Sequence, residues 1–315
     1  MSYCFGVEIE LIAKPLVVQD PLPKRVYYEK LARALNEKGL LATADKLDGS
    51  RYRKHRKHAK FHDSQWWITK DGSLRDPSYP STVPLEAVSP ILSTAVRWDR
   101  EVNAFWRAWG DVFETPNASS LCGSHIHVSQ YPQKTFSLTR LKNIAIGVIF
   151  YEPLVHELLP KCRQNNQYCR RNTLRSLQLL NMGSNAEHEL REVYRYISQE
   201  IWDEKGLRDF MQKHTGKRDD RHVLWNFDNI LPGGSGSVEF RGGHGLRGPS
   251  ETRKWIAFVV AFIHLCTETF WEDLIKAARF LNVREHLPLD YKDMMGLYKL
   301  DCDDEFEGCY CCCIM

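Results

Sequence analysis

The segment from Phe5 to Ile12 reads Phe-Gly-Val-Glu-Ile-Glu-Leu-Ile, so apolar and acidic residues alternate in it. In an extended chain, successive side chains point to opposite faces, which places the apolar residues on one face and both Glu8 and Glu10 on the other. Neighbouring carboxylates repel each other, and burial raises the cost of their ionisation. A divalent cation removes both costs, and oxygen ligands favour magnesium or manganese. The segment therefore indicates either a central strand with a metal site or an amphipathic strand with one wet face.

The composition is that of a soluble globular protein. The chain has 315 residues, of which 43% are hydrophobic and 26% charged, and this length can bury a large core in one or two domains. A net charge of +3 is too small to indicate a nucleic-acid-binding protein. We expect no secretory leader, no membrane span in the apolar run Trp255–Cys266, and a cytoplasmic location with reduced thiols.

Short apolar segments between turns predict five further strands: Trp66–Ile68, Pro84–Leu92, Leu121–Ser129, Arg221–Phe227 and Ser237–Arg241. Helical spacing of apolar residues predicts helices at Val26–Lys38, Thr94–Phe113, Thr139–Leu159, Glu187–Gln212 and Pro249–Phe280, the last as one helix or two. Strands and helices do not alternate strictly. The expected fold is therefore α+β, with helices packed on one face of a mostly antiparallel sheet.

The expected domain, residues 1–286, contains a basic insertion at about residues 49–64 and is followed by an acidic, cysteine-rich tail, residues 287–315. The insertion interleaves six lysines and arginines with three histidines and has no apolar periodicity. Such a stretch indicates a solvated insertion, or else an electrostatic collar for an anionic substrate or partner.

Polar residues recur inside the expected strands, and three times they stand two residues apart. Besides the first strand, His125 and His127 form such a pair, Glu239 and Arg241 form another, and Glu86 is a lone acid in an apolar segment. Both members of a pair leave the same face of a strand. Acids and imidazoles suit divalent cations, and the planar guanidinium suits a phosphate or a carboxylate. We therefore expect the strands to bring these side chains to one polar cavity opposite the core.

Nucleotide-binding loops of the usual kinds are not evident. The glycine-rich run Gly233–Gly236 lacks the Lys-Ser/Thr ending of a P-loop, and no dinucleotide fingerprint follows a strand. A nucleotide would therefore bind on the sheet together with metal ions. The histidine pair also fits a metal-dependent hydrolase of amides or phosphates, and a catalytically dead binding module is a further alternative. Consumption of ATP distinguishes an enzyme that uses a nucleotide from a hydrolase and from a binding module.

The ordered set of motifs resembles the amidoligase family, which is related to glutamine synthetase and glutamate–cysteine ligase. The motifs span about residues 3–265 and read FGVEIELI, WWITKDGSL, PLEAVSPIL, LCGSHIHVS, YCRRN and SVEFRGGHG. The resemblance implies an ATP-dependent carboxylate–amine ligase that forms an amide bond through an acyl phosphate. It also implies Mg²⁺ or Mn²⁺ as cofactor, a carboxylate and an amine as small-molecule or peptide substrates, and a site on a curved, glutamine synthetase-like sheet.

The resemblance carries roles to matching positions. It implies metal ligands at Glu8, Glu10, Glu86, His125 and Glu239. His127 would contact the nucleotide or a metal, and Arg241 would steady the transferring phosphate. Asp71 would bind the substrate or its amine, while Arg170 and Arg171 would bind an anionic group. Ser124 stands where a larger apolar residue is expected, and together with the insertion it leaves the substrate open.

The chain ends Cys312-Cys313-Ile314-Met315, which fits the prenylation pattern, and the terminal Met favours a farnesyl group. One lipid anchors weakly, so palmitoylation at Cys309 or Cys311 would supply the second signal, because the preceding segment is acidic. Lipidation of Cys312 would attach the protein peripherally to the cytosolic face of a membrane. An unmodified tail, or one whose thiols bind a soft metal, is the alternative.

Overall fold

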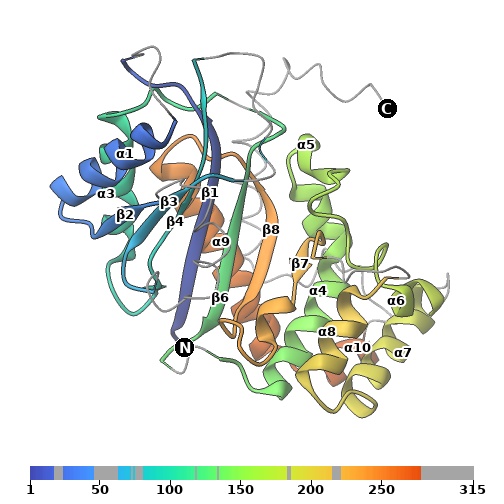
Figure 1. Ribbon diagram of the computed structural model, residues 1–315. Coiled ribbons are helices and arrows are strands. Elements are labelled where there is room, and N and C mark those ends of the chain that lie inside the picture. The colour runs from blue at the N-terminus through green and yellow to red at the C-terminus, as the bar shows by residue number, and fades with distance from the viewer. Residues whose placement is uncertain are drawn as a thin grey trace. The chain divides into compact units, whose positions relative to one another are not determined.

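A computed structural model describes residues 1–17, 24–45, 63–71, 74, 81–117, 119–132, 135–182, 186–214 and 221–277. The chain divides into two compact units (Figure 1). The N-terminal unit comprises Ser2–Ile126 and Gly243–Ile256, and the C-terminal unit comprises His127–Gly242 and the chain from Ala257 onward. Nearly all of the basic insertion and the whole of the cysteine-rich tail lie outside the described residues, so the predictions made for them stay predictions.

The sheet of the N-terminal unit has the strand order β2-β3-β4-β1-β6, and β5 pairs with β1 beside β4. These strands are β1 (Tyr3–Ala13), β2 (Ala42–Ala44), β3 (Trp66–Thr69), β4 (Val83–Val88), β5 (Leu92–Ser93) and β6 (Gly123–Gln130). The β1–β4, β1–β5 and β3–β4 pairs are antiparallel, whereas β2 and β3 run parallel. The sheet is thus open, mixed and mostly antiparallel, which confirms the predicted α+β class. Its likeness to glutamine synthetase stays a prediction.

Helices α1 (Arg25–Glu37) and α3 (Trp98–Gly110) and the first turns of α9 (Pro249–Glu268) complete this unit. Helix α1 contacts α3, β2 and β3, and Figure 1 shows it beside them. Trp66 stacks on Phe105 of α3 with 4.3 Å between the ring centroids. The indole of Trp106 donates a hydrogen bond to the Thr252 hydroxyl over 2.8 Å, which joins α3 to α9. Large aromatic rings therefore form much of this core.

The first turn of α9 is held by an acid. Glu251 accepts hydrogen bonds from the Arg247 backbone and guanidinium, and its carboxylate lies 3.6 Å from Nε2 of His244. Burial acts to raise the pKa of Glu251, but the His244 and Arg247 contacts outweigh it and hold the pKa at about 2.

The strands of the C-terminal unit have the order β6-β8-β7. They are the end of β6, β7 (Trp225–Asn226) and β8 (Val238–His244), and β7 pairs antiparallel with β8. The helices are α4 (Leu138–Leu158), α5 (Lys161–Gln164), α6 (Leu177–Asn181), α7 (Ala186–Gln199), α8 (Glu204–Gln212), the 3-10 helix η2 (Asp228–Ile230), the rest of α9, and α10 (Trp271–Ala277). Helix α4 contacts α7 and α8, and α6 contacts α8.

One glycine sets how closely the helices of this unit approach. A Cβ atom on Gly147 of α4 would lie 2.3 Å from Sγ of Cys266 and 2.9 Å from the Trp271 ring. No real side chain tolerates such a contact, so α4 and α9 pack at this separation because residue 147 is glycine.

Several boundaries differ from those predicted. The expected helix Glu187–Gln212 is broken into α7 and α8, because Asp203 takes an extended conformation and caps α8 by accepting a hydrogen bond from Gly206 N over 2.6 Å. The last predicted segment, expected as one helix or two, forms the two helices α9 and α10, whereas the predicted strand Arg221–Phe227 is reduced to β7. Strand β2 and helices α5 and α6 were not predicted, since elements of three to five residues are too short to show a period.

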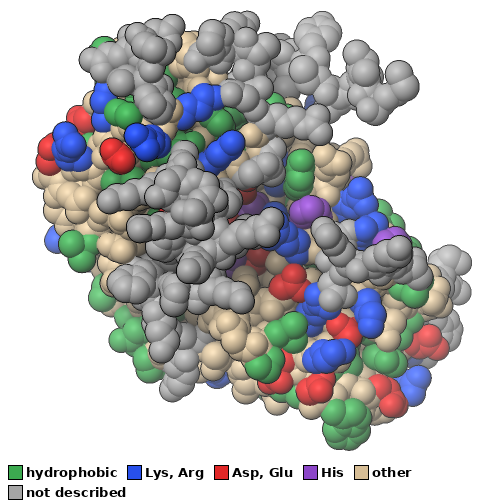
Figure 2. Space-filling view, in the orientation of Figure 1, with side chains coloured by type: hydrophobic (Ala, Val, Ile, Leu, Met, Phe, Trp, Pro, Cys, Tyr) green, Lys and Arg blue, Asp and Glu red, His purple; other side chains and the backbone are tan. Residues whose placement is uncertain are grey.

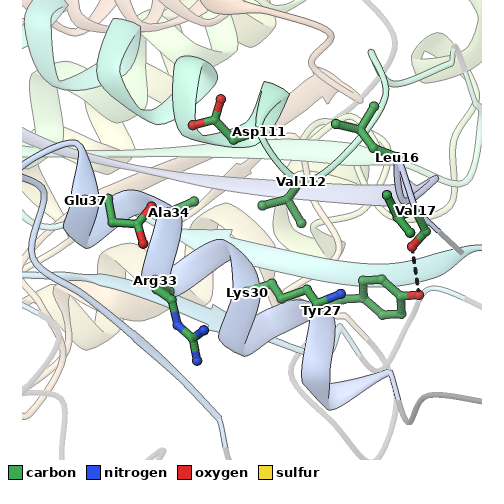
Figure 3. A pocket seen from close by; sticks show the side chains of 9 residues that line it. All are labelled: Leu16, Val17, Tyr27, Lys30, Arg33, Ala34, Glu37, Asp111 and Val112. Atoms are coloured by element: carbon green, nitrogen blue, oxygen red, sulfur yellow. Dashed lines mark hydrogen bonds between the residues drawn. The ribbon is translucent and has the colours of Figure 1, made fainter. Parts of the chain in front are cut away.

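The N-terminal unit also has a pocket of about 240 Å³ between α1, the end of α3 and the segment after β1 (Figure 3). Its apolar wall includes Leu16 and Val17, and the Tyr27 hydroxyl donates to the Val17 carbonyl over 3.4 Å. Lys30 lies over the Tyr27 ring. None of the predicted site residues lines this pocket.

Among the described helices, none combines the length and the apolar character needed to cross a bilayer. The five scattered cysteines that the structure describes, Cys4, Cys122, Cys162, Cys169 and Cys266, form no disulfide bonds.

Candidate functional site

The alternation in β1 places its acids as predicted. Val7, Ile9 and Leu11 are at most 1% exposed, whereas Glu8 and Glu10 are half-buried. In the neighbouring strand β4, apolar and acidic residues face the same two sides of the sheet as in β1. Glu10 lies opposite Glu86 of β4 in the antiparallel register, and the apolar partners alternate with them. One face of this sheet is therefore core, and the other carries carboxylates at the centre of the sheet.

His125 of β6 joins the two acids of β1. Its Nδ1 lies 2.8 Å from Oε2 of Glu8 and 3.6 Å from Oε1 of Glu10. One ligand atom from each of the three residues lies within 4.8 Å of the others. His125 is 3% exposed, so this contact with the two acids is largely shielded from solvent. Two carboxylate oxygens and one imidazole nitrogen are a donor set that suits a divalent cation such as Mn²⁺ or Mg²⁺.

Glu86 borders this cluster, and Asp71 is a further buried acid of the same unit. Asp71 follows β3 and is 8% exposed, and Glu86 lies on β4 opposite Glu10. Burial raises the pKa of the neighbouring Cys122 thiol to about 11, and the charges of Glu10 and Asp71 act in the same direction.

In the C-terminal unit, His127, Glu239 and Arg241 lie together. The Nε2 atom of His127 is 4.0 Å from Oε1 of Glu239, and the Arg241 guanidinium forms a short ion pair with the same oxygen. Nε of Arg241 also donates to the Tyr168 carbonyl over 3.3 Å. On the other side of the imidazole, Nδ1 lies 3.4 Å from the Ser237 hydroxyl. Glu239 and Arg241 are 4% and 8% exposed, so this ion pair is almost completely buried.

The two predicted arginines of the YCRRN motif differ in their surroundings. Arg170 is exposed, and its backbone bridges to Val223. Arg171 donates from Nε to Oε2 of Glu152 over 3.3 Å. Glu152 is completely buried in α4, and it also accepts hydrogen bonds from Asn172 N and Thr173 N. Burial raises the pKa of this carboxyl, while the contacts with Thr173 and Arg171 act to lower it.

The charged surface over α6, α7 and α8 is of a different kind. Figure 2 shows basic and acidic side chains interspersed over these helices. Lys205 pairs with Asp209 over 2.8 Å, one helical turn away, and Arg208 pairs with Asp228 over 2.7 Å. Paired charges of both signs indicate a solvated face.

The structure thus gathers the predicted residues in two groups, one in each unit. The first group is Glu8, Glu10, Glu86 and His125, and the second is His127, Glu239 and Arg241, whereas no contact joins Asp71 to either group among the interactions described above. The prediction that all of them line one cavity stays a prediction.

A family model described as "Putative amidoligase enzyme" matches residues 1–263. The chain belongs to this amidoligase family. No curated protein and no solved structure matches it. The match covers β1 through most of α9, so every residue of both groups lies inside it.

Sequence reasoning missed three buried polar residues of this amidoligase, two of which support Glu239 and one of which holds Arg171. Asn226 and Gln212 are 3% and 0% exposed, and Asn226 donates to Glu239. Glu152 is the third. Asn226 in Leu-Trp-Asn-Phe and Glu152 in Ile-Phe-Tyr-Glu-Pro-Leu are lone polar residues in apolar runs, the same signal that pointed to Glu86. Gln212 gives no such signal, because its partners come from other segments.

Proposed function

We propose that this amidoligase is an ATP-dependent carboxylate–amine ligase that uses Mg²⁺ or Mn²⁺. The observation that carries the proposal is the cluster of Glu8, Glu10 and His125, with ligand atoms within 4.8 Å of one another, in a chain that belongs to an amidoligase family. A carboxylate does not react with an amine at neutral pH, because its negative charge makes it a poor electrophile. Forming an amide therefore requires that one carboxylate oxygen first become a good leaving group.

The reaction balances with ATP as the activating reagent. A carboxylate oxygen attacks the γ-phosphorus, and the bond to ADP breaks, which gives an acyl phosphate and ADP. The amine nitrogen then attacks the acyl carbon, inorganic phosphate leaves with the carboxylate oxygen, and the amine loses a proton. A bound divalent cation neutralises the phosphate charge that such a transfer develops.

The chain's own residues would hold and orient the reactants. Glu8, Glu10 and His125 would bind the cation, with Glu86 opposite Glu10 as a further acid. Arg241 has its guanidinium fixed by Glu239 and the Tyr168 carbonyl, and its positive charge would steady the transferring phosphate.

Two further residues would bind the substrates. Arg170 is exposed and would bind an anionic group, whereas Arg171 is engaged by Glu152. Asp71 would accept a hydrogen bond from the amine and orient it toward the acyl carbon.

The test is ADP release by the purified protein with Mg²⁺ across a panel of amino acids, polyamines and peptides. When an active pair is found, a carboxylate labelled with ¹⁸O should transfer one label to inorganic phosphate. Glu10→Gln and Glu239→Gln should lower turnover by about 10²–10³-fold, the range for loss of one charge partner in a dry site. Glu114→Gln, a surface acid paired with Lys14, is the control.

Two results would contradict the proposal. Turnover of an amide without ADP release would indicate a hydrolase. Unchanged ADP release in both site variants would remove those acids from the reaction.

A further inference from the structure

Glu239 is fixed at both oxygens by different donors. Arg241 donates to Oε1, and Nδ2 of Asn226 donates to Oε2 over 2.7 Å. A carboxylate held at both oxygens has its plane fixed as well as its position. Because Glu239 and Asn226 are 4% and 3% exposed, water does not compete effectively for these contacts.

The orientation of the Asn226 amide is itself determined. Its Oδ1 accepts from Gln212 Nε2 over 2.9 Å and from Asp228 N over 3.0 Å. Both are donors, so the oxygen must face them and the NH₂ group must face Glu239. A flipped amide would place oxygen against the carboxylate and NH₂ against two donors.

Gln212 is oriented in the same way. Its Oε1 accepts from Phe227 N over 2.7 Å, so its Nε2 faces Asn226 and Asp228, each 2.9 Å away. The side chain is completely buried at the last residue of α8. A directional series of hydrogen bonds therefore runs from the backbone of Phe227 through two amides to Glu239.

We propose that Asn226 and Gln212 are positioning residues, which hold the Glu239 carboxylate in the orientation that binds a divalent cation. This inference rests on the proposed function and on the metal-ligand role that the family resemblance implies for Glu239, whose Oε1 lies 4.0 Å from Nε2 of His127. The Asn226 side fits that role, because its amide is neutral and holds Oε2 without adding a second positive charge to that of Arg241. Partners behind a metal ligand typically contribute about 10–100-fold to metal affinity.

A purely structural role is the competing explanation, since the same amides join α8 to β7. Metal affinity and thermal stability separate the two roles. Ser176→Ala is the matched structural control, because Ser176 is completely buried, donates to Phe210 O of α8 and does not contact Glu239.

The experiment measures binding of Mn²⁺ to the purified full chain by the electron paramagnetic resonance signal of free Mn²⁺, with melting temperature recorded for each variant. The Mn²⁺ binding that is present in the wild type and lost in Glu239→Gln is the binding that depends on this acid. We expect Asn226→Ala to weaken the same Mn²⁺ by about 10–100-fold. We expect a smaller loss in Gln212→Glu, which keeps the acceptor for Phe227 N and removes the donor to Asn226.

The control should lower the melting temperature and leave the Mn²⁺ affinity unchanged. Wild-type affinity in Asn226→Ala would overturn the inference and leave the proposed function standing. Loss of affinity in Ser176→Ala equal to that in Asn226→Ala would also overturn it, because general destabilisation would then suffice. Absence of Mn²⁺ binding by the wild-type chain, or binding that Glu239→Gln does not alter, would overturn both the inference and the proposed role of Glu239.

Discussion

Replacing Glu10 by Gln should stabilise the metal-free protein and abolish its stabilisation by a cation. The Glu8 and Glu10 oxygens lie within 4.8 Å of each other. At that distance two unit charges repel by about 3.5 kcal/mol at an effective dielectric constant of about 20, and by about 1 kcal/mol in water. The two side chains are 24% and 14% exposed, which favours a value near the lower end. We therefore expect the free energy of unfolding to rise by about 1 kcal/mol.

Glu10 is the informative acid of the pair. Nδ1 of His125 is 2.8 Å from Glu8 but 3.6 Å from Glu10, so the histidine compensates mainly Glu8. Removing the charge of Glu10 relieves repulsion and leaves the 2.8 Å contact between His125 and Glu8 in place, and Gln preserves the shape of the side chain.

The assay is urea unfolding at pH 7, first with EDTA and then with Mn²⁺. The wild-type protein should gain about 2.7 kcal/mol when Mn²⁺ is at 100 times its dissociation constant, and the variant should gain almost nothing. Glu114→Gln makes the same charge change at the surface and should alter stability by less than about 0.5 kcal/mol. If Glu10→Gln is less stable than the wild type in EDTA, the acid is a structural partner of His125 and the reasoning is wrong.

Three further predictions concern contacts that stabilise the fold of the two units, namely those of Glu152, Gly147 and Glu251. Glu152→Gln should lower the free energy of unfolding by about 1.5–3 kcal/mol in urea titrations, because one charge-assisted acceptor is replaced by a donor among donors. Gly147→Ala should cost about 1–3 kcal/mol by overpacking, whereas Gly110→Ala, with no atom within 4 Å of its Cβ, should cost nothing and gain up to about 1 kcal/mol. The lowered pKa of Glu251 contributes stability that is fully present above about pH 4.5 and is lost as the pH falls toward about 2, so Glu251→Gln should flatten the unfolding free energy across that range.

Each of these has an outcome that would contradict it. Wild-type stability of Glu152→Gln would mean that the acid is already protonated in the folded protein. Equal effects of the two glycine variants would refute the close approach of α4 to Cys266. A pH dependence that persists in Glu251→Gln would assign the acid transition to other carboxyls.

The sequence was sufficient where the signal is local. Alternation predicts β1 and the side on which its acids lie, because the period of a strand is a property of consecutive residues. The motif order also predicted the family, which the match over residues 1–263 confirms.

The sequence was insufficient where the partners are distant in the chain. The register that sets Glu10 opposite Glu86, and the convergence of Gln212, Asn226 and Glu239, depend on how separate segments pair. Helix boundaries failed for a smaller reason. Apolar spacing continues from α7 into α8, but residues 200–203 are not helical, and the extended Asp203 begins α8 as its cap.

The register of β1 has a consequence for relatives of this chain. The acids are placed by the apolar residues between them, since Ile9 and its partner Ala87 in β4 occupy the core face of adjoining strands. The packing of this core fixes the arrangement whether or not the acidic face takes part in catalysis. A descendant could therefore replace every carboxylate by an amide and keep the same architecture, so inheritance of the fold alone is no guarantee of catalysis. Under the proposed function, the residues at positions 8, 10 and 125, read one by one, would distinguish a working ligase from an inactive relative.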